Sequence, residues 1–144
     1  MKIGDKVRTF HIFKINKELS ILLDESPYNL YKTLEGIYLL NKENVSYGAY
    51  LLEQVISFID IEKYNKLLYE KNKDNDFYMK IGNYHRIINK YREETTKITV
   101  KKTYILVESN VLAKNISLFF PSNDLFVCDF ANKDYFWLSK IVAV

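Results

Sequence analysis

The sequence predicts an α/β protein of the mixed α+β kind, in which helices pack on a small mixed β-sheet in a single domain, 1–144. The length of 144 residues is that of one ordinary domain and is enough to bury a sizeable core. Hydrophobic residues make up 48% and charged residues 27%, the balance of a globular protein. Short segments with strand-like alternation lie near both ends, and helix-like apolar stripes lie between them.

The first predicted strand covers 8–15 (RTFHIFKI). It carries apolar residues on both of its alternating sides, so we expect both faces to be partly covered. The next segment, 15–23 (INKELSILL), holds more apolar residues than a connector needs. An exposed apolar patch usually marks an interface. The alternative is that these residues simply cover the edge of the sheet.

Three helices are predicted in the next part of the chain. They cover 27–41, 46–59 and 61–68, each with apolar residues on one stripe. Ser26 can cap the first helix and Pro27 suits its first position. Ser46 can start the second helix and Asp60 can cap the third. The polar stretch 69–76 is predicted as an exposed loop.

The segments that follow complete the predicted fold. A helix is one interpretation of 83–93, since its apolar residues can share a helical face. Alternating residues in 97–101 and 104–108 predict a hairpin. Ser109 or Asn110 can cap a further predicted helix that Pro121 closes. The apolar run 125–128 predicts a strand covered on both faces. Strand, helix and strand in this order predict a right-handed parallel crossover, hence a mixed sheet.

Charge and cysteine content narrow the function classes. The net charge is +3, and the lysines are mixed with acids along the chain, which is typical of a solvated surface. We therefore expect no direct contact with nucleic acid. The single cysteine, Cys128, excludes an internal disulfide framework and predicts a buried, reduced thiol. No signal core or membrane-spanning run occurs in the sequence, so we expect a cytoplasmic protein with no membrane contact. We also expect a monomer.

No motif for catalysis or for cofactor binding is present. Neither glycine-rich phosphate loop occurs, and the two histidines lack the spacing of a zinc site. A nucleophilic pair would need Cys128 beside His11 or His85, and an apolar strand disfavours a thiolate. Asp129 ends that strand and more commonly caps a turn than forms a site. We expect no catalytic residue, no cofactor and no metal, and a protein that binds another protein.

Both ends of the chain resemble one protein family. The segment 126–138 (FVCDFANKDYFWL) resembles the closing motif of the SirA (sporulation inhibitor of replication) family: an apolar strand, Asp-Phe, a polar turn, an aromatic residue and Trp-Leu. The segment 10–20 (FHIFKINKELS) is similar to the family's opening aromatic strand and the Lys/Glu-rich turn after it. The resemblance covers about half of the chain, and the middle, 60–95, shows little that aligns. It implies one SirA-like domain over 1–144.

The resemblance also implies a function and a partner. SirA-type proteins bind the N-terminal domain of the bacterial replication initiator DnaA and inhibit initiation of chromosome replication. Carried onto matching positions, their docking surface implies Leu19, Leu23 and Gln54 as contacts. The family is aromatic at two of these positions, so leucine there loses ring area and a hydroxyl. Lys17 and Glu18 are expected to set the orientation of binding.

Three alternatives remain open at this stage. One is an accessory protein that binds nucleic acid through Lys97, Lys101, Lys102 and Tyr104, with strong salt dependence. Another is an interaction module with a different partner in a phage or its host. The last is an enzyme built around Asp129 and His85, which requires both side chains in one pocket. The composition, rich in Lys, Asn and Ile, fits an AT-rich genome such as that of a Gram-positive bacterium.

Overall fold

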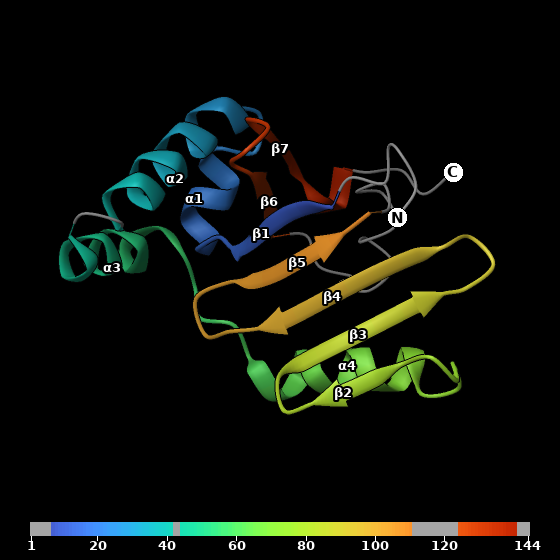
Figure 1. Ribbon diagram of the computed structural model, residues 1–144. Coiled ribbons are helices and arrows are strands. Elements are labelled where there is room, and N and C mark those ends of the chain that lie inside the picture. Colours follow the sequence, from blue (N-terminus) through green and yellow to red (C-terminus); the bar gives the residue numbers. More distant parts are fainter. Residues whose placement is uncertain (1–6, 42–43, 111–123, 141–144) are drawn as a thin grey trace.

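A computed structural model of the chain describes residues 7–41, 44–110 and 124–140. Within these ranges, seven strands form one antiparallel sheet in the order β2–β3–β4–β5–β1–β6–β7 (Figure 1). The strands are β1 (Arg8–Lys14), β2 (Met79–Ile81), β3 (Tyr84–Asn89), β4 (Glu94–Val100), β5 (Ile105–Ser109), β6 (Leu125–Asp129) and β7 (Asp134–Trp137). The predicted combination of a sheet with packed helices is confirmed.

The helices lie on both faces of this sheet. They are α1 (Lys17–Leu22), α2 (Pro27–Asn41), α3 (Val45–Val55), α4 (Ile61–Asn72) and the short 3₁₀ helix η2 (Leu138–Lys140). Helices α1, α2 and α3 gather beside β1, β6 and β7, whereas α4 lies against the other end of the sheet, near β3 and β4 (Figure 1). The α2 helix packs against both α3 and β7.

Strand alternation divides the buried residues into two cores. In β1, Phe10 and Ile12 belong to the core under α4, whereas Phe13 belongs to the core under α1, α2 and α3. In β6, Val127 faces the α4 side and Phe126 faces the α2 side. Successive side chains of a strand point to opposite faces, so each of these two strands buries apolar side chains on both of its sides. The predicted two-sided burial of both strands is therefore confirmed.

Side-chain caps determine where three of the helices begin. Asn16, Asn44 and Asp60 each accept a hydrogen bond from the backbone N–H three residues later. Such caps satisfy backbone donors that a helix cannot satisfy itself. The predicted Asp60 cap and the predicted start at Pro27 are confirmed. The second helix begins at Val45, one residue before the expected start at Ser46, and Asn44 caps it.

The sheet connections differ in part from the predicted crossover. Strands β5 and β6 both pair antiparallel with β1, which lies between them. They run in the same direction, as predicted, but they are not neighbours. All paired strands described are antiparallel, so the sheet is antiparallel where a mixed one was expected. The helix predicted between Ser109 or Asn110 and Pro121 falls on 111–123, outside the described residues, and Ser109 is the last residue of β5.

The middle of the chain corrects three predictions. The helical interpretation of 83–93 is wrong, because Tyr84–Asn89 is strand β3, paired with β4 along its whole length. The loop predicted at 69–76 begins too early, since α4 continues to Asn72, which is buried and donates to the Leu68 carbonyl. The α3 helix ends at Val55, before Ile59. The hairpin predicted around residues 97–108 is confirmed as β4 and β5.

Candidate functional site

Helix α1 is attached to the end of α3. The backbone N–H of Asn16 donates to the Val55 carbonyl at 2.9 Å, and its side-chain amide donates to the Gln54 carbonyl at 3.4 Å. One residue earlier, Ile15 forms an isolated β-bridge with Ile56. These contacts place the first turn of α1 next to the last turn of α3. Segments nearly forty residues apart in sequence thereby lie side by side.

The five residues predicted to contact a partner fall into two groups. Leu19 and Leu23 are half-buried and pack against the core under α1, α2 and α3. Lys17, Glu18 and Gln54 are exposed, and the Gln54 side-chain amide donates weakly to the Tyr50 carbonyl at 3.5 Å. The structure thus brings Gln54 close to the start of α1. The contact role of all five residues stays a prediction.

Ile21 and Leu22 are the large apolar side chains of α1 that are most exposed. They are 70% and 73% exposed on α1, and Tyr50 on α3 is 58% exposed. Sequence reasoning grouped Ile21 and Leu22 with the apolar connector but did not choose them as contacts. A helical interpretation of 17–22 would have found them, because Leu19 and Leu23, four residues apart, share the inner face. Here the α1–α3 surface means the exposed residues Lys17, Glu18, Ile21, Leu22, Tyr50 and Gln54.

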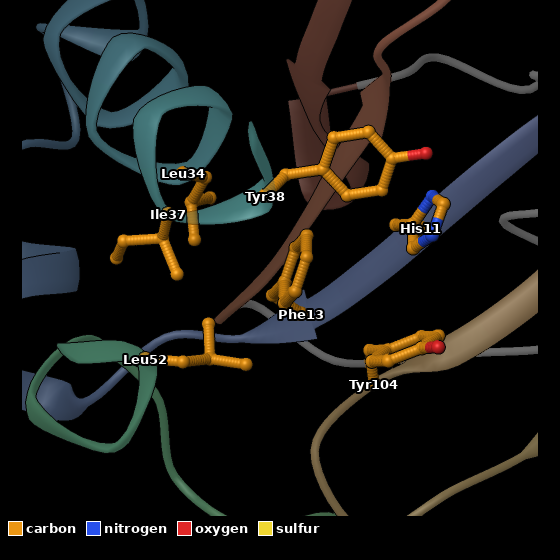
Figure 2. A pocket seen from close by; sticks show the side chains of 7 residues that line it. All are labelled: His11, Phe13, Leu34, Ile37, Tyr38, Leu52 and Tyr104. Carbon is orange, nitrogen blue, oxygen red and sulfur yellow. The ribbon is translucent and has the colours of Figure 1, made fainter. Parts of the chain in front are cut away.

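A cavity of about 200 Å³ lies between α2, α3, β1 and Tyr104, at the start of β5 (Figure 2). Its lining consists of His11, Phe13, Leu34, Ile37, Tyr38, Leu52 and Tyr104. The ring of His11 lies among other rings, with centroids 5.0 Å from Tyr104, 5.2 Å from Phe130 and 5.3 Å from Tyr38. Such edge and tilted contacts favour a fixed arrangement of the rings.

The imidazole of His11 is neutral at pH 7. Burial, with a smaller contribution from the charge of Lys101, lowers the pKa of His11 to about 4. Its Nδ1 atom is shielded from water and has no hydrogen-bond partner within the described part of the chain. Buried polar atoms are normally paired, so an unpaired one calls for an explanation.

Cys128 lies directly opposite His11 on the neighbouring strand β6. Sequence reasoning asked whether these two residues meet, and the register of the sheet brings them together. The thiol is fully buried, and burial, followed by the charge of Glu35, raises the pKa of Cys128 well above its ordinary value. A protonated thiol without access to solvent is a poor nucleophile. The prediction of a buried thiol is confirmed.

Asp129 and His85 do not share a pocket. Strands β4, β5 and β1 separate β3, which carries His85, from β6, which carries Asp129. The Asp129 carboxylate accepts from Arg8 Nε at 2.8 Å and from the Asn132 amide at 2.7 Å. Burial alone would raise the pKa of Asp129, but these hydrogen bonds outweigh burial and lower it. The enzyme hypothesis based on this pair therefore lacks its required geometry.

The three lysines that the nucleic-acid alternative invokes have different neighbours in the structure. Lys101 Nζ lies 3.2 Å from the Tyr104 hydroxyl, so these two residues contact each other. Lys102 Nζ instead lies 4.3 Å from the centroid of the Phe58 ring. Lys97 lies opposite the acidic Glu108 in the register of β4 and β5. These lysines do not form the concentrated basic stripe that phosphate binding favours.

No three His, Cys, Asp or Glu side chains in the described ranges are arranged to hold a metal ion. Among the helices described, none has the length and apolar character needed to span a bilayer. A comparison with models of known protein families finds no match to this chain, and a comparison with curated proteins finds no matching sequence.

Proposed function

We propose that this chain is a protein-binding regulator whose α1–α3 surface contacts the N-terminal domain of a replication initiator of the DnaA type and inhibits initiation. One observation carries the proposal. Ile21 and Leu22 are 70% and 73% exposed on a short helix that the fold holds firmly at its start. Adjacent apolar side chains that leave water only on binding are what an interface anchor needs. The SirA resemblance at both ends of the chain supports the choice of partner.

The residues of α1 have two roles in binding, according to the face of the helix on which they lie. Leu19 and Leu23 pack inward and hold the helix on the core, so their contribution is to position α1. Ile21 and Leu22 point outward and supply the apolar contact. Pre-positioned anchors lose less conformational entropy on binding than flexible ones do.

Charged and aromatic neighbours surround these anchors. Lys17 and Glu18 are exposed on the same short helix and orient the partner through their opposite charges. Tyr50 and Gln54 extend the surface onto α3, and the exposed Tyr50 ring offers rigid contact area with a polar edge. The inhibition is steric: the bound chain covers a helical surface that the initiator needs for self-association or for recruiting other factors.

The test uses a double variant of the exposed anchors. Ile21→Lys/Leu22→Lys should weaken binding to the isolated initiator domain at least tenfold in calorimetry, since two buried apolar side chains contribute about 3 kcal/mol or more. Ile81→Lys is the matched control, because Ile81 is 64% exposed on β2 at the other end of the sheet (Figure 1). Circular dichroism should show that both variants remain folded, since neither changes a buried residue.

Two results would contradict different parts of the proposal. Absence of binding by the unchanged chain at tens of micromolar would exclude the initiator as partner. Equal binding by the anchor variant and the control would exclude the α1–α3 surface. In a low-GC Gram-positive host, overexpression of the chain should lower the ratio of origin DNA to terminus DNA. The anchor variant should leave that ratio unchanged.

A further inference from the structure

The two faces of strands β3 and β4 are covered unequally. One face packs under α4, where Ile98 is part of the core and His85 bonds to Asn65 of that helix. Arg86 and Lys97 lie on the opposite face, because successive strand residues alternate between faces. On that side, the described helices α1, α2 and α3 gather beside β1, β6 and β7 instead (Figure 1). Here the open face means the face of β3 and β4 that carries Arg86 and Lys97.

Two cations face each other on the open face. Arg86 and Lys97 are directly paired in the register of β3 and β4. Like charges directly opposite on one face of a sheet destabilise it, because the two side chains lie close together. Lys97 has the acidic Glu108 opposite it on β5, yet neither cation forms an ion pair with a described acid. The free protein therefore retains a repulsion that a bound anion would offset.

The guanidinium of Arg86 is half-buried, and its hydrogen-bonding capacity is unused. Nε is shielded from water and has no hydrogen-bond partner within the described part of the chain. The two Nη atoms are not shielded in this way, and they form no hydrogen bond with a described residue either. A guanidinium with both Nη atoms free can hold a carboxylate or a phosphate through two parallel hydrogen bonds. Such a ligand needs access to the Nη atoms alone.

The neighbours of Arg86 favour a carboxylate over a chain of phosphates. Met79 lies opposite Arg86 on β2, and Tyr84 and Ile88 lie two residues before and after it on the same face. These three side chains are partly exposed and offer apolar contact around the guanidinium. Glu108 lies on the same face of β5, and it repels a run of phosphates more than a single carboxylate bound at Arg86.

We propose that the open face binds an acidic segment of a partner protein. One Asp or Glu carboxylate of that segment accepts hydrogen bonds from the Nη atoms of Arg86, and the apolar side chains beside it pack on Tyr84 and Ile88. Lys97, directly opposite Arg86, adds electrostatic attraction. The open face shares no residue with the α1–α3 surface, so this proposal does not rest on the initiator as partner.

The experiment compares two synthetic peptides that differ by one charge. The Glu peptide is acetyl-Ser-Ile-Glu-Val-Ser-amide, and the Gln peptide has Gln in place of Glu. NMR titration of the whole chain at low salt should show saturable binding of the Glu peptide at millimolar concentration. The Gln peptide should bind about tenfold more weakly, as expected for hydrogen bonds to a charged group. The Nε–H signal of Arg86, which burial protects from exchange, should shift with the Glu peptide and so locate the site without any substitution.

Two variants and a control separate geometry from charge. Arg86→Lys keeps the positive charge but removes the planar fork, so binding of the Glu peptide should weaken about tenfold. Lys97→Gln should weaken binding less, and it should raise the urea midpoint of unfolding because it removes a like-charge pair. Arg92→Gln is the matched control, because it removes one positive charge from the exposed turn of the same hairpin. It should leave binding unchanged.

Several outcomes would overturn the proposal. They are the absence of saturable binding by the Glu peptide, equal binding of both peptides, an unmoved Arg86 signal, and a loss in Arg92→Gln as large as in Arg86→Lys. If a variant fails to fold, the Arg86 signal of the wild-type protein still decides the location.

Two further outcomes would assign the open face to another occupant. A single-stranded oligothymidylate that binds more tightly than the Glu peptide, with the same Arg86 shift, would identify a nucleic-acid site instead. An Arg86 signal that moves with protein concentration alone would identify a second copy of the chain. The initiator domain is absent from all of these measurements, so the initiator-binding proposal can fail while this one holds.

Discussion

His85 is fully buried on the α4 side of the sheet, with both ring nitrogens hydrogen-bonded. Nε2 lies 2.8 Å from Asn65 Oδ1, and Nδ1 lies 2.7 Å from the Tyr78 hydroxyl. Because the Asn65 oxygen only accepts, Nε2 donates to it and Nδ1 accepts from Tyr78. Burial, followed by the charge of Lys80, lowers the pKa of His85 to about 4. A neutral imidazole thus connects α4 to β3.

Stability should therefore depend on pH between about 6.5 and 4. The unfolded chain binds a proton at His85 below about pH 6.5, whereas the folded chain does so only below about pH 4. The stabilisation is complete above pH 6.5 and is lost as pH falls through this window. We expect the free energy of unfolding to fall by about 1.4 kcal/mol per pH unit from His85. Urea unfolding at several pH values measures this slope.

The variant His85→Gln separates this contribution from others. Glutamine keeps a donor and an acceptor but does not titrate, so the pH dependence should become shallower. It should not vanish, because His11 also has a pKa lowered to about 4. An identical slope in His85→Gln and the wild type would show that His85 does not titrate in this window.

Helix α1 and strand β3 are two elements whose type the local pattern of apolar residues does not determine. The six residues Tyr84–Asn89 fit both a helical face and strand alternation, and pairing with β4 and β2 decides for the strand. A single-sequence pattern cannot show that pairing, because it depends on tertiary contacts. Segment 17–22 is too short for helical periodicity to identify, and its helix depends on the Asn16 cap.

The Asn16 cap should control the stability of α1. In Asn16→Ala, the Leu19 N–H loses its acceptor, and the hydrogen bond from the residue 16 side chain to the Gln54 carbonyl is also lost. We expect a loss of about 1 kcal/mol and faster hydrogen exchange at the Leu19 amide. Asn16→Ser is the control, since serine keeps a capping oxygen and should restore most of the protection. Unchanged exchange in Asn16→Ala would mean that the cap does not hold the helix.

In the molecule as a whole, β1 and β6 lie between the two cores and contribute buried side chains to both. The apolar residues on both sides of β1 and the continuous apolar run of β6 predicted burial on both faces, and in β6 Phe126 and Val127 confirm it from opposite sides. The strand order was not predictable, because each strand pattern is compatible with several neighbours. The α1–α3 surface was found only in part, since the outward direction of Ile21 and Leu22 depends on packing of Leu19 against the core.

The buried position of Cys128 on β6 makes its thiol a probe of global unfolding. The side chain is fully buried between β1 and β7. We expect a thiol reagent such as Ellman's reagent to label Cys128 only when the sheet opens, at the rate of unfolding. An introduced thiol at Ile21→Cys should react at once, because that position is 70% exposed. Rapid labelling of Cys128 in native buffer would contradict this account of the core.

The central place of β1 has a consequence for how the chain is made. Arg8 pairs with Ser109, and His11 pairs with Cys128, so both neighbours of β1 are synthesised roughly 100 or more residues after it. Contacts this distant in sequence close slowly, since a long loop must be ordered first. The apolar first strand therefore leaves the ribosome well before its partners exist. During synthesis, this segment is the part of the chain with most need of a chaperone.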